Sequence, residues 1–222
     1  MLRIFTAFSG YDSQCIALNR IGVDYDLVGW SEIDKYAIKA HNALFPQYAE
    51  RNYGDISRID WKSVPDFDLF TYSFPCTDIS TAGQQKGLTE GSGTRSSLLW
   101  ECRKAIETKR PRFLIMENVK ALVSEKFIPL FREWETYLRS LGYTNYSAVL
   151  NAKDYGVPQN RERIFMVSIL GGGGYEFPHK EENNKCLRDV LEENVDRCYF
   201  LGKKTVEYNL HNRGGSGRAR SK

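Results

Sequence analysis

The sequence lacks any run of about eighteen apolar residues, the length that a helix needs to cross a membrane. Its first residues, MLRIFTAFSG, turn polar too soon for the apolar stretch of a secretory signal peptide. The sequence also lacks internal repeats, which argues against a repeat architecture. We therefore expect no membrane partner and a globular chain of one large domain or one and a half, since 222 residues can bury a sizeable core.

Cysteine and histidine are few and scattered, which argues against a metal centre. The number of cysteines is odd and no CxxC occurs, so the sequence predicts neither a disulfide framework nor a zinc site. No histidine clusters with a cysteine, so we expect no metal, and a reducing, cytoplasmic location is the default. The cysteines are Cys15, Cys76, Cys102, Cys186 and Cys198, and the histidines are His41, His179 and His211.

The net charge of +3 is distributed unevenly. The end of the chain, HNRGGSGRARSK, holds Arg213, Arg218, Arg220 and Lys222 and no acid. Such a segment could contact phosphates, although a solvated basic tail is the more usual interpretation.

Apolar segments of strand and helix type alternate along the chain, separated by short connections. Strand–helix alternation predicts an α/β fold of Rossmann-like type, with a mostly parallel sheet covered by helices on both faces. The expected strands are residues 2–8, 26–32, 67–74, 112–119, 144–152 and 163–170, and the expected helices are 13–21, 34–45, 97–109, 126–142 and a short one at 185–195.

Polar clusters follow four of these strands, namely FSGYDS, SEIDK, FPCTDIS and MENV. In such sheets ligands bind at the carboxyl ends of the strands, so these clusters are expected to converge. In the first cluster Gly10 permits a tight turn before a helix, although an ordinary turn capped by Asp12 or Ser13 is an equal alternative.

The second strand ends at Glu32, where an acid commonly binds ribose hydroxyls. GDI at 54–56 is expected to follow a third, edge strand, with Asp55 accepting from an adenine amino group and Ile56 packing on the ring. The alternative is that both acids only cap turns. Together the clusters indicate a site for a cofactor that carries adenosine.

Cys76 follows Pro75 directly and opens the polar stretch TDISTAGQQKGLTEGSGTR. A lone cysteine is usually a buried core residue. A long polar loop instead favours a functional thiol, because a nucleophilic cysteine must be partly exposed and long loops often bind ligands.

Two further groups complete this cluster of candidate residues. Glu117 directly follows the buried strand FLIM, where an acid needs a partner or a function. In QNRER, Arg161 and Arg163 alternate onto one side of a strand. A surface face paired in salt bridges is the usual interpretation, but arginines beside a glutamate and a cysteine suggest recognition of a base and its phosphate.

Taken in order, these motifs resemble those of the cytosine-5 DNA methyltransferase family over roughly residues 2–170. FSGYDS resembles the F-x-G-x-G turn, SEIDKYAIKAHNALFP the ribose-binding strand and helix, and GDI the adenine contact. FPCTDISTAGQQKGL resembles the proline–cysteine motif with its catalytic loop, and RSSLLWE the helix whose leucine touches the cofactor. MENVKAL resembles the E-N-V motif and NAKDYGVPQNRERIF the Q-x-R-x-R motif. PC, ENV and QxRxR in this order are specific, whereas a generic Rossmann dehydrogenase needs none of them.

The resemblance implies a DNA methyltransferase that uses S-adenosylmethionine and acts on a cytosine flipped out of the duplex, in a bacterial or phage restriction–modification setting. It implies that Cys76 attacks carbon 6, Glu117 binds ring nitrogen 3 and the exocyclic amine, Arg163 holds the carbonyl oxygen, and Arg161 orients the loop or a phosphate. The residues expected to hold the cofactor are Phe8, Gly10, Tyr11, Asp12, Ser13, Glu32, Ile33, Asp55, Ile56, Pro75 and Leu98.

Three departures from the family pattern bear on these expectations. Asp12 and Ser13 replace glycines of the first turn, and Thr77 stands where the family has glutamine. No counterpart of the family's later motifs follows QxRxR, so we expect residues 1–170 to form the catalytic domain and 171–222 to begin a target-recognition region with a basic tail. The alternatives are an inactive or split subunit that needs a complementing polypeptide, and an RNA cytosine-5 methyltransferase.

Overall fold

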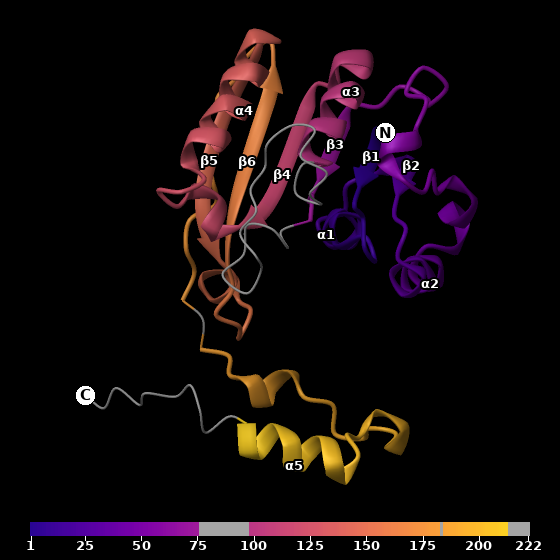
Figure 1. The fold of residues 1–222 in the computed structure, drawn as a ribbon, viewed down its shortest axis with the longest axis vertical. Coiled ribbons are helices and arrows are strands. Elements are labelled where there is room, and N and C mark those ends of the chain that lie inside the picture. The colour runs from indigo at the N-terminus through magenta and orange to yellow at the C-terminus, as the bar shows by residue number, and fades with distance from the viewer. Residues whose placement is uncertain (76–97, 183, 213–222) are drawn as a thin grey trace. The chain divides into compact units, whose positions relative to one another are not determined.

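The computed structural model of the chain describes residues 1–75, 98–182 and 184–212. Contacts divide the chain into two compact units, Met1–Asn183 and Asn184–Lys222. The first unit holds the sheet and most of the helices (Figure 1).

Six strands form one mixed sheet in the order β2-β1-β3-β4-β6-β5. The strands β2, β1, β3 and β4 run parallel, whereas β6 is antiparallel to both β4 and β5. The predicted α/β fold with a mostly parallel sheet is thus confirmed. The strands are β1 (Leu2–Ala7), β2 (Tyr25–Ser31), β3 (Leu69–Tyr72), β4 (Phe113–Val119), β5 (Tyr143–Asn151) and β6 (Glu162–Leu170).

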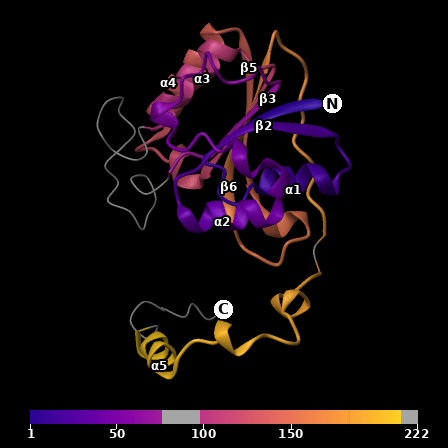
Figure 2. The same cartoon turned by 90° about the vertical axis from the view of Figure 1, so that its right-hand side faces the viewer.

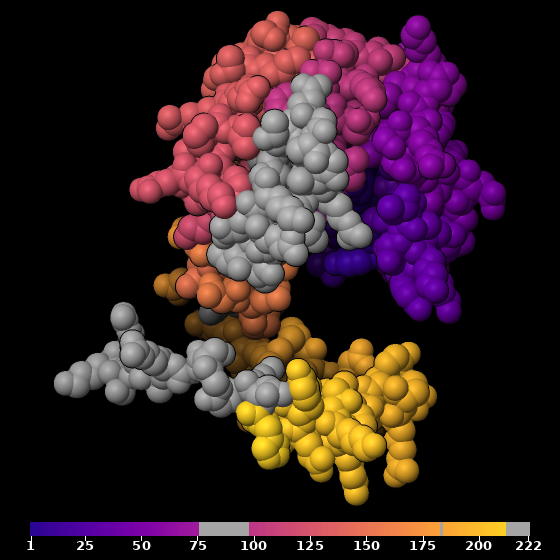
Figure 3. All heavy atoms as spheres, in the orientation of Figure 1, coloured from indigo at the N-terminus to yellow at the C-terminus, as the bar shows by residue number. Residues whose placement is uncertain are grey.

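Helices cover both faces of the sheet. Successive strand residues point to opposite faces, and the apolar side chains on each face pack against helices. Ile4 and Leu69 pack into a core with α1 (Ser13–Arg20) and α2 (Lys35–Leu44), whereas their neighbours Phe5 and Phe70 pack into a second core with α3 (Leu99–Lys109) and α4 (Ile128–Ser140). The side view in Figure 2 separates the two helix pairs. In Figure 3 the indigo-to-purple residues of β1, α1, β2 and α2 lie on one side of the first unit, and the salmon residues of α4 and β5 lie on the other.

Close aromatic packing explains the glycine in the middle of β2. A Cβ atom on Gly29 would lie 2.7 Å from ring atoms of both Phe5 and Tyr53. The β1–β2 pairing also shifts register here, between Ile4 and Phe5. A larger residue at 29 would therefore force the two aromatic rings apart.

The expected edge strand before Gly54 is not formed. Residues Pro46–Arg51 instead make the short 3-10 helix η1, and a single bridge joins Trp30 to Asn52. Proline suits the first position of a helix because its missing N–H would have no intrahelical partner there. The short 3-10 helix η2 (Ile56–Arg58) follows, with Asp55 as its N-cap.

The second unit is built from short elements. The helix expected at 185–195 is reduced to the 3-10 turn η6 (Leu187–Val190), and a second turn, η7, spans Arg197–Tyr199. The helix α5 (Lys203–Asn212) was not predicted from the sequence. Large apolar side chains of this unit, Leu187, Leu191, Phe200 and Leu210 among them, are exposed.

Candidate functional site

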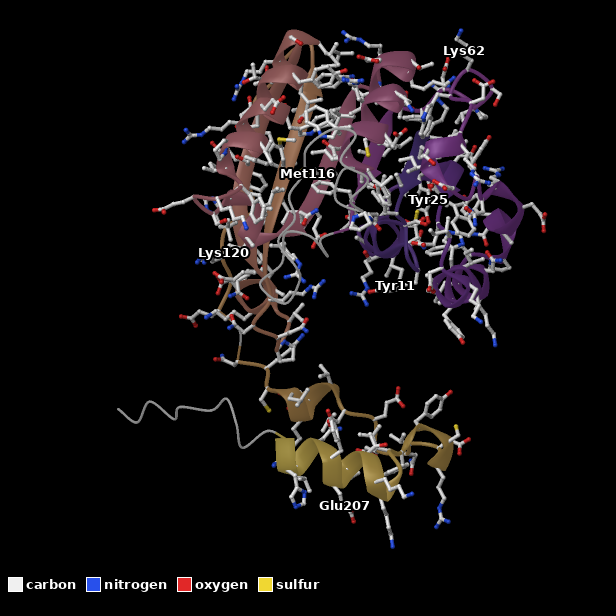
Figure 4. The ribbon with its side chains drawn as sticks, in the orientation of Figure 1. Tyr11, Tyr25, Lys62, Met116, Lys120 and Glu207 are labelled. Carbon is white, nitrogen blue, oxygen red and sulfur yellow. The ribbon has the colours of Figure 1, made fainter. Side chains whose placement is uncertain are left out.

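The described residues of the polar clusters that follow the strands gather at one edge of the sheet. Figure 4 shows Tyr11, just after β1, and Lys120, just after β4, at the same end of the sheet, with Lys62 at the opposite end. Because β6 is antiparallel, its first residues also reach this edge, and so do the last residues of β5. Arg163, for example, lies opposite Val119 and Leu150.

The turn after β1 has an unusual backbone. Phe8, Gly10 and Asp12 all have positive φ values, of 55°, 59° and 66°. Glycine adopts this region without cost, but a bulky residue such as Phe8 does so only where its surroundings hold it there, and such outliers concentrate at functional sites. The strained turn therefore marks this edge of the sheet as a candidate site.

A cavity of about 540 Å³, here called the Glu32 cavity, opens beside this turn. Its size is within the range of small-molecule sites. It is lined by residues from the turns after β1, β2 and β3, from the segment around η2, and from the start of α3, namely Phe8, Ser31, Glu32, Ile33, Asp34, Gly54, Asp55, Ile56, Ser73, Pro75 and Leu98.

Glu32 is fixed by backbone groups on three sides. Its Oε2 accepts a hydrogen bond of 3.0 Å from the N–H of Gly10, and its Oε1 accepts from the N–H groups of Ile33 and Asp34 at 2.8 and 2.9 Å. Asn52 holds its main chain, because its amide accepts from the Glu32 N–H and donates to the Glu32 carbonyl. A carboxylate offers about four acceptor sites, so Glu32 keeps capacity for a ligand hydroxyl.

Asp55 both caps η2 and lines the Glu32 cavity. Its Oδ1 accepts from the backbone N–H of Ser57 at 3.0 Å and from the Ser57 hydroxyl at 2.8 Å. The backbone hydrogen bond, followed by the hydroxyl bond, lowers the pKa of Asp55 below its usual value. The side chain is therefore an ionised acceptor near neutral pH, and its Oδ2 lies 3.8 Å from Nε of Arg58.

A second cavity of about 590 Å³, here called the Glu117 cavity, lies at the ends of β1, β3 and β4 and the start of β6. Glu117 on β4 and Arg163 on β6 meet inside it, with Oε1 and Nε 3.0 Å apart. Arg161, two residues before Arg163, lines the same cavity, whereas Glu162 between them pairs with Lys120. Arg161 directly precedes β6 and Arg163 is its second residue, so the two arginines, two positions apart, line the same cavity.

The two cavities share Phe8 and Ser73 as lining residues. Phe8 follows β1 and Ser73 follows β3, and these strands are neighbours in the sheet. From β1 the chain proceeds to β2, which lies on one side of β1 in the sheet, and from β3 it proceeds to β4, which lies in the opposite direction. The cavities therefore meet between β1 and β3, where the strand order reverses. Open α/β sheets bind their ligands at this point.

The structure distributes the residues that the sequence singled out between these cavities. Glu32, Ile33, Asp55, Ile56, Pro75 and Leu98 line the Glu32 cavity, Tyr11, Ser13, Glu117, Arg161 and Arg163 line the Glu117 cavity, and Phe8 lines both. Gly10 contributes through its hydrogen bond to Glu32. Asp12 lines neither cavity, since its side chain is buried against Thr6. Cys76 lies outside the described residues.

Some residues of the site were not found from the sequence. Asn52, which clamps Glu32 and accepts from the Gly54 N–H, belongs to a stretch without helix or strand periodicity. Thr71, Ser73 and Tyr155 also line the Glu117 cavity. The Thr71 hydroxyl is buried there without a hydrogen-bond partner among the described residues. Only the position of Ser73 beside the FPC motif could have drawn attention to it.

The described part of the chain contains no group of three or more acids, histidines or cysteines placed to hold a metal ion. Among the same residues, no helix has the length and apolar character that crossing a membrane requires.

Comparison with known proteins gives one consistent family. The profile of the C-5 cytosine-specific DNA methylases matches residues 2–220. The chain is 41% identical to the type II methyltransferase M2.ScrFI of Lactococcus lactis subsp. cremoris, over 93% of this chain and 72% of that protein. It is 33% identical to the orphan methyltransferase M.Rho11sI of Bacillus phage rho11s, over 91% of this chain but only 46% of that protein.

Solved structures agree on the fold. The Dnmt2 methyltransferase of Schizosaccharomyces pombe superimposes with a TM-score of 0.72 over 95% of this chain and 66% of that one, at 22% sequence identity. The chain thus spans about half to three quarters of the length of these relatives.

Proposed function

Because the chain belongs to the C-5 cytosine-specific DNA methylase family, we propose that it transfers a methyl group to carbon 5 of cytosine in DNA. The observation that carries the proposal is the pair of adjoining cavities at the reversal of strand order. One is lined by Glu32 and Asp55, and the other by Glu117 and two arginines. Methyl transfer needs the donor site and the acceptor site to adjoin each other. The two cavities adjoin at Phe8 and Ser73, which line both of them.

The Glu32 cavity fits S-adenosylmethionine by the chemistry of its donors and acceptors. Glu32 offers acceptor capacity for ribose hydroxyls, and Asp55 offers an ionised oxygen for an amino group on a ring. Phe8, Ile33, Ile56 and Leu98 supply apolar surface for the ring itself. When bound, the cofactor supplies an electrophilic methyl group.

In the Glu117 cavity we assign roles to three charged side chains. Glu117 hydrogen-bonds ring nitrogen 3 and the exocyclic amine of cytosine, and Arg163 holds the carbonyl oxygen. Arg161 orients the catalytic loop or a phosphate. Support comes from the 3.0 Å contact between Glu117 and Arg163, which points an acceptor and a donor into one space.

Cys76 is proposed as the nucleophile. Its thiolate adds to carbon 6 and moves electron density to carbon 5, which would then take the methyl group as the methyl–sulfur bond of the donor breaks. Transfer of the carbon 5 proton to a base would restore the ring double bond and expel the thiolate. Pro75, the residue before it, lines the Glu32 cavity. Carbon 6 is buried in a duplex, so the cytosine must be flipped out at a cost of a few kcal/mol.

The rest of the proposal concerns partners and setting. We assign residues 1–170 to the catalytic domain and 171–222 to the start of a target-recognition region, which a complementing polypeptide could complete. Exposed apolar side chains in the second unit are surface of the kind that a protein partner binds. A bacterial or phage restriction–modification system is the proposed context, in line with the relatives described above.

A duplex that carries 5-fluorocytosine tests the proposal directly. Carbon 5 then has no removable proton, so the adduct with Cys76 should persist as a covalent complex in the presence of S-adenosylmethionine. Cys76→Ser should abolish the complex and methyl transfer yet leave cofactor affinity unchanged, and Cys186→Ser is the matched control. Trapping through another residue, or a complex that persists in Cys76→Ser, would refute the assignment. If the chain binds cofactor but forms no complex even with a complementing polypeptide, an inactive subunit is the better description.

A further inference from the structure

Asp12 begins α1 but does not cap it. Its side chain accepts no capping hydrogen bond from the backbone of the first turn, although an aspartate at this position usually does. The side chain instead points inward and is fully buried, with Oδ2 accepting a hydrogen bond of 2.8 Å from the Thr6 hydroxyl on β1. The backbone stays in the left-handed region, at a φ of 66°, which L-residues adopt at some cost.

The partner of Asp12 across the interior is His41, on the far side of the turn. His41 lies on α2, is fully buried, and places Nε2 3.5 Å from Asp12 Oδ2. With a proton on Nε2 the two groups attract each other electrostatically, and the contact does not have the geometry of a regular hydrogen bond. Asp12 Oδ1 and His41 Nε2 accordingly have no hydrogen-bond partner among the described residues.

This contact joins the two turns that bound the Glu32 cavity. Asp12 closes the turn that contains Phe8 and Gly10. The His41 ring stacks on Trp30, with centroids 3.7 Å apart and planes at 19°. Trp30 stands two residues before Glu32 on β2, and α2 begins just after Glu32. The hydrogen bond from the Gly10 N–H to Glu32 therefore joins the turn that Asp12 closes to the strand end whose Trp30 packs on His41.

We propose that Asp12 and His41 are positioning residues whose buried contact keeps the turn of residues 8–12 in register with Glu32 for cofactor binding. The inference rests on the proposed function, because it takes S-adenosylmethionine as the ligand of the Glu32 cavity. It reassigns Asp12 from a cofactor contact to a support behind the cavity.

Buried polar groups that lack partners are costly, so each residue of the pair depends on the other. Removing one deletes the contact that joins the two turns, although Asp12 keeps its hydrogen bond from Thr6 and His41 keeps its contact with Asn42. The turn then shares its population with other conformations. The apparent dissociation constant rises in inverse proportion to the competent fraction. A turn that is competent one tenth of the time would bind the cofactor about tenfold more weakly.

The test measures S-adenosylmethionine affinity by calorimetry, together with thermal unfolding, well below the lowest Tm of the set. His41→Phe keeps an aromatic ring on Trp30 but removes the ring nitrogens. Asp12→Gly removes the carboxylate and suits the positive φ. Asp12→Asn keeps an acceptor for Thr6 and places an amide near His41, so it is the conservative variant. Leu138→Ala is the stability control, because Leu138 is a buried core residue of α4 that lines neither cavity.

We expect His41→Phe and Asp12→Gly each to raise Kd about tenfold, and Asp12→Asn to raise it less than about threefold. The double variant should bind more tightly than the product of the single effects predicts, because neither group is then left unpaired. Leu138→Ala should lower Tm and leave Kd unchanged. Single variants with wild-type Kd, or single effects that multiply fully, would overturn the inference.

Two arms separate this inference from the proposed function. If the wild-type chain does not bind S-adenosylmethionine, the proposed cofactor is wrong. If the wild type binds, Glu32→Ala weakens binding and His41→Phe does not, the proposed function stands and the positioning role of His41 is refuted.

Discussion

Glu117 and Arg163 form an ion pair across two antiparallel strands, with Oε1 of Glu117 3.0 Å from Nε of Arg163. The two residues are not directly opposite each other, since Glu117 faces Phe165, and the contact therefore runs diagonally between β4 and β6. Both side chains keep about a quarter of their surface exposed, at 27% and 23%. The pair uses one carboxylate oxygen and one guanidinium N–H, and Nη1 of Arg163 also donates to the Glu162 carbonyl at 2.8 Å. Both residues still have capacity to bind a base.

From this pair we predict that Glu117→Gln slows methyl transfer by about 10²–10⁴-fold, the usual range for loss of a positioned acid or base. An amide cannot supply the proton that stabilises the cytosine adduct. Single-turnover transfer of a labelled methyl group measures the effect, and calorimetry should show unchanged cofactor affinity. The control is Glu135→Gln, which should behave as wild type, since Glu135 lies on α4 and pairs with Arg139. A rate within threefold of wild type for Glu117→Gln would remove it from the chemical step.

Glu32→Ala should weaken cofactor binding more than it slows the chemical step at saturating cofactor. A hydrogen bond to a charged group contributes about 1.5–3 kcal/mol, which corresponds to roughly a ten- to hundredfold change in affinity. Titration calorimetry gives the affinity. Asp66→Asn, which removes an exposed acid that pairs with Lys109, controls for the change in net charge. Unchanged affinity in Glu32→Ala would exclude it from the cavity's binding surface.

Much of this site follows from the sequence because the strands fix it. Arg161 and Arg163, two positions apart, line the same cavity, and parallel strands bring their polar ends to one edge. Glu32, Asp55 and Glu117 therefore line cavities at the strand ends, where the polar clusters were expected to converge, and their roles there stay predictions. The sheet was predictable for the same reason.

The turn after β1 could not be predicted in the same way. Its residues have no periodicity, and three positive φ values rotate the side chains to unrelated directions. Tyr11 and Ser13 consequently line the Glu117 cavity while Asp12 turns inward to Thr6 and His41. Long-range contacts of this kind, like the Asn52 clamp on Glu32, depend on tertiary structure that local patterns do not encode.

Tyr72→Phe should destabilise the first unit although it deletes one atom. The Tyr72 hydroxyl accepts a hydrogen bond of 3.0 Å from the indole N–H of Trp134, and both side chains are fully buried. Without the hydroxyl, the indole N–H is left unpaired, at a cost of about 1–3 kcal/mol. Urea denaturation measures the loss. Combining Tyr72→Phe with Trp134→Phe should show coupling between the two sites; purely additive losses would contradict the role of the hydrogen bond.

The last prediction concerns acid stability and the pair Arg3–Asp68, which ties β1 to the residue before β3. Asp68 accepts from the Arg3 guanidinium and from the Arg3 backbone N–H, with the carboxylate 3.1 Å from Nη2. The side-chain hydrogen bond, followed by the backbone bond, lowers the pKa of Asp68. Its folded pKa thus lies below the unfolded value of about 3.9. The stability that the pair adds is fully present above that unfolded value and is lost as the pH falls through the folded pKa.

Asp68→Asn should therefore be less stable than wild type at about pH 7, and the difference should shrink toward about pH 3. The effect should be modest and weaker in high salt, because both side chains are partly exposed. Arg3→Gln should show the same trend, and the double variant should lose little more than either single one, since both substitutions break one interaction. Urea denaturation at the two pH values measures these differences. A gap between wild type and Asp68→Asn that stays constant or widens on acidification would contradict the direction of the pKa shift.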